Sequence, residues 1–491
     1  MKIKQNIVCI LVVTMITLSV TSCNDWLDVQ PRSQLRDSEL FSTQMGFKEA
    51  LAGVYSLLAS PDLYVRELRF GLLGALAQEW TDIVPVSAYQ AELQYDFEAT
   101  NPTRRINAIW GGMYNAIANV NVIIEVIDDR RDIFSSPNFE VIKGEALALR
   151  AFMHFDLLRM FGASFAVNPS GDRWAIPYVT RYTSLIFPQL TIGEVMEKIL
   201  EDFELAARYL REWDPISNHY IGREITQQVD NGYLLNRSLR LNYYAVRGMQ
   251  ARAHLWRGSH VHGDFQKAAE FSEYVINSGR FRWTTGTEMN GADFSGASEQ
   301  LWGLNVTHQN RIVRNHFENT PDAGDPRTGP AFIISDADRE VYFENHTADY
   351  RYLFLFRLGN QANQWFLRKF DAPAATAPII NRNRMSMIKL AEMYYILAET
   401  QRELGGDYLA TFNAVRRARN VPVLTEILDF ENTLFLEKRK EFLGEGQLWF
   451  FFKRKNRQHI PRTSLDLIAL NAYIFPLPDA EFEGAPRHPN R

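Results

Sequence analysis

The sequence predicts a mainly α-helical fold, a tetratricopeptide-like scaffold of helical hairpins that carries long irregular loops and few short strands. Three observations point to it. Apolar residues recur at spacings of three and four through several long segments. Residues 144–162 form an apolar stretch without proline or internal glycine. Two further segments, 241–279 and 386–421, each read as helix, short turn, helix.

The first helix is expected at residues 42–58, where Phe47, Leu51 and Leu58 fall in register. Residues 61–103 are expected to be irregular, because prolines interrupt them. A long helix should follow at 109–128, with one stripe formed by Trp110, Tyr114, Ile117, Asn121, Ile124 and Ile127.

Residues 144–162, GEALALRAFMHFDLLRMFG, predict a central buried helix. Leu147 and Leu158 share one face, while Phe152 and Phe155 lie on others. A helix that is apolar on nearly all sides is buried among neighbours. Its arginines, Arg150 and Arg159, would therefore need carboxylate or carbonyl partners.

A loop is expected at 163–188, and Thr191 then begins the most regular helix of the chain. Thr191 and Glu194 have the spacing of a capping box, in which each side chain satisfies a free backbone N–H. Ile192, Met196 and Phe203 continue the apolar face at spacings of four and seven.

The two later hairpins share a Gly-Asp-aromatic turn, at Gly263–Asp264–Phe265 and Gly406–Asp407–Tyr408. Asp264 and Asp407 are expected helix N-caps, because a carboxylate accepts hydrogen bonds from first-turn N–H groups. Paired helices of this size are similar to tetratricopeptide repeats of about 34 residues. Two unrelated helical hairpins are the alternative.

Residues 280–384, between the hairpins, show no sustained period. This segment is too long for an ordinary loop and must fold on the scaffold, with short strands such as 366–370. Binding residues are often carried by such segments. The chain ends with a basic run after 436–452 and an extended, proline-containing stretch at 473–482.

Composition excludes several classes of function. The 491 residues are 46% hydrophobic and 13% aromatic, which suffices for a large core. A formal charge of −5 with a pI of about 6.1 gives no reason to expect nucleic acid or an anionic membrane surface as partner. Two cysteines, Cys9 and Cys23, allow neither a disulfide framework nor a CxxC zinc site.

The N-terminus predicts a lipoprotein signal peptide at residues 1–22. Lys2 and Lys4 precede an apolar run at 7–20, which falls short of the roughly 20 residues that a spanning helix needs. The following Val-Thr-Ser-Cys resembles a bacterial lipobox, which implies cleavage before Cys23 and lipidation of Cys23. An ordinary secretory signal with an incidental cysteine is the alternative.

Several segments in order resemble the SusD/RagB family of Bacteroidetes surface lipoproteins. Besides the lipobox, they are the helices at 109–128 and 144–162, DYRYLFLF at 349–356, MIKLAEMYYILAE at 387–399, EKRKEFLGEGQLWFFFKRK at 437–455 and YIFPLPDAEF at 473–482. Lys438 stands where the family usually has arginine, unless Arg439 takes that place. Phe451 and Phe452 replace the usual Asp-Leu, which puts the local packing in doubt.

The resemblance implies four tetratricopeptide-like units, made from an N-terminal region, 23–215, and a C-terminal region, 216–491, in one compact unit. It implies a partner, a SusC-like TonB-dependent transporter, over which the protein sits as a lid. The acidic, aromatic segment 24–28 resembles the one that accompanies export to the outer face of the outer membrane. No cofactor and no nucleic-acid partner is implied.

Candidate ligand-binding residues are aromatic and polar side chains of the irregular segments, since aromatic faces pack on sugar C–H groups and polar groups bind hydroxyls. They are Trp80, Asp82, Tyr89, Tyr95, Trp283, Asn310 and Trp365. The family's ligand residues lie outside its motifs and are not carried over. Trp302 is expected in the core.

No sequence motif for catalysis appears: neither Walker A, GxGxxG, HExxH, GxSxG nor an EF-hand. His254, His260 and His262 are interpreted as exposed loop residues rather than metal ligands.

Four functions stay open. The first hypothesis is a non-enzymatic binder of oligosaccharides that delivers them to the transporter. The others are a RagB-like binder of peptides or glycopeptides, a lipid-anchored glycoside hydrolase, and a purely structural role in transporter assembly.

Overall fold

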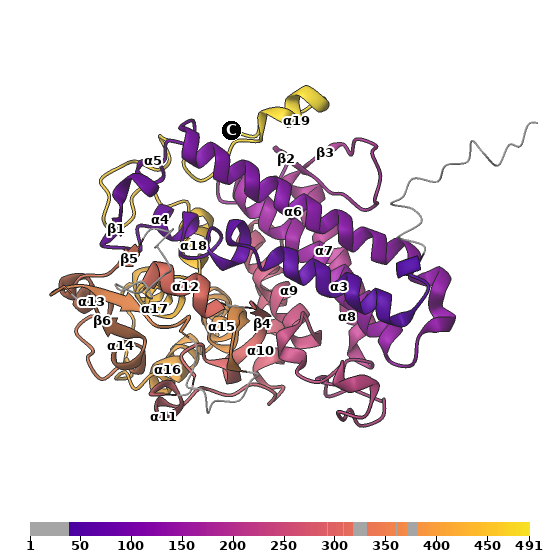
Figure 1. Ribbon diagram of the computed structural model, residues 1–491. Coiled ribbons are helices and arrows are strands. Elements are labelled where there is room, and N and C mark those ends of the chain that lie inside the picture. The colour runs from indigo at the N-terminus through magenta and orange to yellow at the C-terminus, as the bar shows by residue number, and fades with distance from the viewer. Residues whose placement is uncertain (1–38, 292, 308, 318–330, 360, 372–380) are drawn as a thin grey trace, which may run out of the picture.

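The computed structural model describes residues 39–491 except for 292, 308, 318–330, 360 and 372–380 (Figure 1). The predicted signal peptide and Cys23 lie outside the described residues. Among the helices of the described part, none combines the length and the apolar character needed to cross a membrane.

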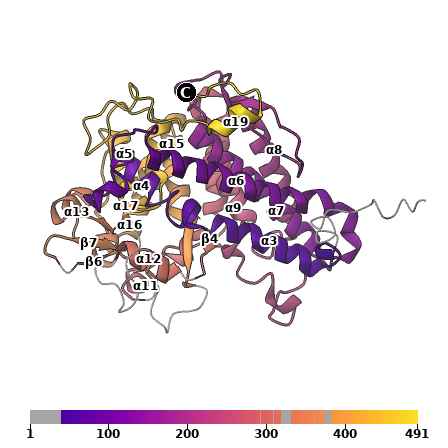
Figure 2. The ribbon, with the colours of Figure 1, turned by 45° about the horizontal axis from the view of Figure 1, so that its top comes forward.

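The scaffold consists of long helices that pack against one another in chain order. They are α3 (Gln44–Leu58), α6 (Thr100–Val126), α7 (Asn138–Phe161), α8 (Ile192–Arg211), α9 (Tyr243–Arg257), α10 (Asp264–Ile276), α15 (Leu390–Leu404) and α16 (Tyr408–Ala418). Each contacts the next, so the array consists of four consecutive helical pairs. Figures 1 and 2 both place α3, α6 and α7 side by side, with α15 and α16 toward the other end. The predicted mainly helical fold is confirmed.

Helix α7 is the buried centre of the array. Every residue of α7 except Glu140 is buried. Arg150 donates hydrogen bonds of 2.7 and 2.8 Å to Asp202, and Arg159 binds Asp156. These partners confirm the expectation that the two arginines are neutralised by carboxylates. The long polar side chains thus let a helix without a solvent face remain inside the protein.

His154 of α7 is buried as a neutral ring. Its Nε2 accepts a hydrogen bond from the Val179 N–H at 2.9 Å, and its Nδ1 lies 2.9 Å from the Arg150 carbonyl. Burial lowers the pKa of His154 to about 3. The residue therefore joins α7 to the segment after β2 without carrying charge.

Helix caps fall close to the predicted residues, with one correction. Thr191 and Glu194 form the predicted capping box of α8. Asp407 accepts from Ala410 N–H at 3.0 Å, as expected of an N-cap. The prediction for Asp264 is wrong: Gly263 is the N-cap of α10, and the Asp264 carboxylate instead binds side chains of α9.

In the part of the chain that the structure describes, the strands form four two-stranded antiparallel sheets. The pairs are β1 (Asp82–Val84) with β5 (Ala331–Ile333), β2 (Trp174–Pro177) with β3 (Gln189–Thr191), β4 (Gln300–Asn305) with β8 (Arg384–Lys389), and β6 (Phe356–Leu358) with β7 (Trp365–Leu367). The strand expected at 366–370 is found in part: β7 begins one residue earlier and ends at Leu367. Residues 386–389, expected to begin a helix, instead pair with β4, and Trp302 of β4 is buried as predicted.

Short helices connect these elements. They are α4 (Leu72–Leu76), α5 (Gln90–Leu93), α11 (Gly286–Met289), α12 (Gln309–Phe317), α13 (Asp336–Tyr342), α14 (Tyr350–Phe354), α17 (Phe430–Phe442), α18 (Gln447–Arg454) and α19 (Asp479–Gly484). The segment expected to be irregular, 61–103, contains α4, α5 and β1, and α6 begins within it at Thr100. The extended stretch at 473–482 ends in α19.

The segments at 349–356 and 437–455, which resemble motifs of the family, meet in the core. Asp349 caps α14 and binds Arg351, whose guanidinium also reaches Glu437 at 3.1 Å and Glu441 at 3.0 Å. Gly446 separates α17 from α18 with a φ of 72°, and a Cβ there would lie 2.4 Å from the Leu68 carbonyl. Charge pairing explains why both segments are polar and yet buried. The close approach explains why a glycine stands at position 446.

Candidate functional site

A polar groove lies on the surface where the chain passes from β1 to α6. A 3₁₀ turn at Val86–Ala88, helix α5 and the first residues of α6 form its walls. Its volume is about 450 Å³, and its lining residues are Ser87, Gln90, Ala91, Gln94, Asp96, Ala99, Thr100 and Asn101. Side-chain amides, hydroxyls and one carboxylate dominate this surface, and such groups both donate hydrogen bonds to and accept them from sugar hydroxyls.

Two buried tyrosines anchor the segment that forms the groove wall. The Tyr89 hydroxyl donates to Glu67 at 2.9 Å, and the Tyr95 hydroxyl donates to the Leu76 carbonyl at 3.0 Å. The Tyr95 ring stacks on Trp449 of α18, with centroids 6.0 Å apart. Burial raises the pKa of Tyr95 to about 12, so its hydroxyl stays a donor at neutral pH. Both tyrosines therefore anchor the wall from below.

Arg105 of α6 ties the groove wall to the core. Its guanidinium binds Glu92 and Glu67, donates to the Ala88 carbonyl at 2.8 Å and lies 4.1 Å from the Tyr89 ring centroid. Burial raises the pKa of Glu92, and the charge of Arg105 opposes that rise. The wall is thus fixed before any ligand arrives, which lowers the entropic cost of binding.

The groove lining carries a single charge, which is negative. Asp96 is the one charged residue among those that line it, and its side chain is exposed. Asp96 also accepts a hydrogen bond from the Glu98 N–H at 3.2 Å. The groove lining contains no arginine or lysine, the residues that bind sulfate or carboxylate groups.

A second surface hollow, of about 330 Å³, lies between α6, the loop at 179–187 and α19. Leu185 and Ile186 on its rim are 76% and 59% exposed. Its two charged residues bond to each other, because Arg487 Nε donates to the Glu481 carboxylate at 2.9 Å. This hollow offers fewer free polar groups than the groove over 86–101, which is therefore the better candidate for a sugar.

Three of the predicted ligand residues, Trp80, Tyr89 and Tyr95, are buried in the core. Trp80 is 4% exposed and donates from Nε1 to the Phe70 carbonyl at 2.9 Å. Tyr89 and Tyr95 are 1% and 4% exposed, with the inward hydrogen bonds given above. Each aromatic polar atom already has a partner inside, so no part of these rings is offered to a ligand.

The structure brings Asp82 and Trp365 to one place. Asp82 pairs with Ile333 in the β1–β5 sheet, and the next residue, Ile334, bridges to Trp365. Asp82 is exposed, while Trp365 is half-buried. The Trp365 indole N–H donates to the Asp336 carboxylate, and the Arg339 guanidinium carbon lies 3.9 Å from the Trp365 ring centroid. Both remain predicted ligand residues. Asp82 is joined to the groove wall along the chain through β1, and Trp365 reaches this place through its bridge to Ile334.

Trp283 lies elsewhere. It packs against Tyr394 of α15, with centroids 5.0 Å apart, and against Arg419 at 5.2 Å. The side chain of Asn310, in α12, is outside what the structure describes, so its predicted role stays a prediction.

The interpretation of His254 as an exposed loop residue is wrong. It is 4% exposed within α9, and its Nδ1 lies 2.6 Å from Asp264. His260 and His262 are exposed, as expected. No group of three or more His, Cys, Asp or Glu side chains in the described part of the chain could hold a metal ion.

Sequence reasoning missed the residues that line the groove. It selected aromatics, whereas Gln90, Gln94 and Asp96 are exposed beside buried Tyr89 and Tyr95. The available signal was the alternation of polar residues with tyrosines in SAYQAELQYD at 87–96, which is typical of a surface segment anchored by its rings.

Comparison with known proteins identifies relatives over almost the whole chain. A family model described as "Starch-binding associating with outer membrane" matches residues 25–217, and the model of the SusD family matches 201–459. The SusD-like protein P38 of Formosa agariphila is 22% identical over 504 residues, which cover 94% of each chain.

Solved structures share the fold. A SusD superfamily protein from Bacteroides thetaiotaomicron superposes with a TM-score of 0.67 at 21% identity, over 91% of this chain and 100% of that one. A laminarin-binding SusD-like protein superposes with a TM-score of 0.63 at 17% identity, over 91% and 99%.

Proposed function

This chain belongs to the SusD family, and from that premise we propose that it captures oligosaccharides at the outer membrane without transforming them. The groove over residues 86–101 is the observation that carries the proposal. It is polar and open, and its wall is anchored to the core, which suits a ligand rich in hydroxyls. The laminarin-binding relative and the starch-binding family description support the same ligand class.

The preferred ligand is an uncharged oligosaccharide. The groove lining carries amides, hydroxyls and the single carboxylate of Asp96, and no cationic side chain. A sulfated or uronic-acid chain would bring its anions close to Asp96 without a compensating positive charge. Such ligands are therefore expected to bind more weakly than neutral ones.

The absence of catalysis is part of the proposal. Glycosidases of the usual kind place two carboxylates on opposite sides of the scissile bond, roughly 5 to 10 Å apart. Among the described residues that line the groove, Asp96 supplies one. A lipid anchor at Cys23 and a SusC-like transporter as partner complete the proposal, on the lipobox and the family resemblance.

Calorimetric titration of soluble protein that begins at Asn24 tests this function. A panel should contain neutral β- and α-glucans, other plant glycans, sulfated and uronic-acid glycans, and peptide digests. We expect saturable binding of a neutral glycan without release of shorter products. Binding of peptides alone would favour the RagB-like alternative, and turnover of a glycan would favour the hydrolase.

Paired variants locate the site. Gln94→Ala and Asp96→Ala should each weaken glycan binding about tenfold, because a hydrogen bond to a ligand contributes roughly 1 kcal/mol or somewhat more. Asp132→Ala is the matched control, since Asp132 is an exposed carboxylate after the opposite end of α6. Equal affinities of Asp96→Ala and Asp132→Ala would remove Asp96 from the site.

A further inference from the structure

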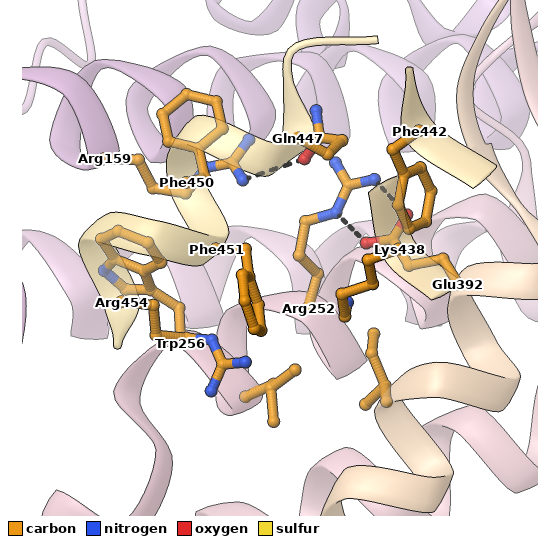
Figure 3. Close-up of a pocket in the computed structure, with 12 residues that line it drawn as sticks. Arg159, Arg252, Trp256, Glu392, Lys438, Phe442, Gln447, Phe450, Phe451 and Arg454 are labelled. Atoms are coloured by element: carbon orange, nitrogen blue, oxygen red, sulfur yellow. Dashed lines mark hydrogen bonds and ion pairs between the residues drawn. The ribbon is translucent and has the colours of Figure 1, made fainter. Parts of the chain in front are cut away.

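A small cavity lies in the interior, where α7, α9, α15, α17 and α18 meet (Figure 3). Its volume is about 50 Å³. Lys438 stands where the family usually has arginine, unless Arg439 takes that place, and Phe451 departs from the family pattern. The two face each other here, with Lys438 Nζ 5.7 Å from the Phe451 ring centroid. Their packing, which the sequence left in doubt, is therefore that of an ammonium against an aromatic ring.

Four cationic side chains line this cavity, and three of them have a carboxylate partner. The bonded pairs are Arg159 with Asp156, Arg252 with Glu392, and Arg454 with Glu399. The Arg252 pair is bidentate, with two bonds of 2.6 Å, visible as dashed lines in Figure 3. These three carboxylates are thus already engaged by guanidinium groups.

Lys438 is the fourth cation, and it lacks such a partner. Its side chain is 8% exposed, and its ammonium forms no hydrogen bond or ion pair with any residue in the part of the chain that the structure describes. The nearest carboxylates that act on its charge, Glu399 and Glu392, are bound to arginines. The rings of Tyr395, Phe442 and Phe451 surround it at 5.5 to 5.7 Å. Four cations against three carboxylates leave the cavity with one excess positive charge.

The buried polar atoms around the cavity that lack a hydrogen-bond partner are donors, like the Lys438 ammonium. Among the buried side-chain atoms of the lining residues that the structure describes, Arg159 Nε and Trp256 Nε1 lack a hydrogen-bond partner. Both are N–H donors. Burial lowers the pKa of Lys438 to about 8, the neighbouring charges of Arg454 and Arg252 add to the fall, and the charges of Glu399 and Glu392 oppose it.

We propose that this cavity binds a small monovalent anion of the halide class, held by the Lys438 ammonium. An anion balances the excess charge and accepts from a donor that has no protein acceptor. A water molecule takes up roughly 30 Å³, so the cavity admits a chloride ion but no bulky oxyanion. Arg159, Arg252 and Arg454 add a favourable field. The carboxylate of Glu392, which also lines the cavity, opposes an anion, and its bidentate bond to Arg252 offsets that charge.

Thermal unfolding of the chain from Asn24 onward tests the site. Sodium chloride is titrated against sodium gluconate at constant ionic strength, so that screening stays equal. A ligand that binds only the folded state raises Tm with its concentration. We expect a saturable rise of Tm in chloride for the wild type and none for Lys438→Met. Lys267→Met, an exposed lysine of α10, is the matched control and should keep the rise.

Bromide makes a test that needs no variant. A crystal of the wild-type protein grown or soaked in bromide should give an anomalous peak beside Lys438 Nζ. A cavity without that peak would overturn the proposal, as would an equal chloride response of Lys438→Met and the wild type.

Discussion

Replacing Arg105 with methionine should destabilise the protein and loosen the groove together. The guanidinium is the cation bound to Glu92, it shares Glu67 with Arg66, and it also donates to the Ala88 carbonyl at 2.8 Å. Methionine keeps the apolar stem but leaves two buried carboxylates without that charge. Removing one partner of a buried ion pair costs about 3–5 kcal/mol, so a loss of that size in the free energy of unfolding is expected.

The loss should depend on pH. Burial already raises the pKa of Glu92, and the charge of Arg105 opposes the rise, so the variant's Glu92 will hold its proton to higher pH. A group whose pKa is raised in the folded state stabilises it at low pH and loses that effect as pH rises. The difference between Arg105→Met and the wild type should therefore be smaller at pH 5 than at pH 8.

Urea unfolding at both pH values, together with calorimetric titration of the glycan, measures these effects. Arg104→Met is the matched control, because Arg104 is the exposed neighbour on the same helix and should change stability by no more than about 0.5 kcal/mol. A loss below about 1 kcal/mol for Arg105→Met, equal at pH 5 and pH 8, would refute the assigned role of this network.

Three further changes are expected to act on stability. Burial raises the pKa of Glu79 to about 8, so the free energy of unfolding of the wild type should fall as pH rises from about 4.5 to 8. Over that range, the stability of Glu79→Gln should rise relative to the wild type by roughly 5 kcal/mol at most. Parallel pH profiles of the two proteins would contradict this. Trp80→Phe should cost about 1–3 kcal/mol in urea unfolding, because the Phe70 carbonyl loses its donor, while glycan affinity stays unchanged; a weakened affinity would return Trp80 to the site. Thr191→Ala should cost about 1 kcal/mol in thermal unfolding through loss of the α8 cap, and an unchanged Tm would count against the capping box.

The scaffold could be predicted from the sequence because its signals are local. Spacings of three and four marked the long helices, and the residues Thr191 and Glu194 marked the start of α8 within one residue. The strand at Arg384–Lys389 was missed because its partner, β4, lies about 80 residues earlier in the chain. No local pattern reports such a pairing.

The site was harder to predict, because a side chain can contact a ligand only if the fold leaves it exposed to solvent. Trp80, Tyr89 and Tyr95 carry the residue types that bind sugars, but their polar atoms bind Phe70, Glu67 and Leu76 inside the fold. Burial of that kind depends on contacts with distant segments. The neighbouring amides and the carboxylate of Asp96 belong to no sequence motif. They line a groove because α5 packs against α6.

A crystal structure of the soluble protein with the neutral glycan that binds most tightly in the titration would test the central claim most directly. The account predicts sugar density over residues 86–101, with hydroxyls within hydrogen-bonding distance of Gln94 and Asp96. Density in the apolar hollow beside Leu185 and Ile186, with the groove empty, would contradict it.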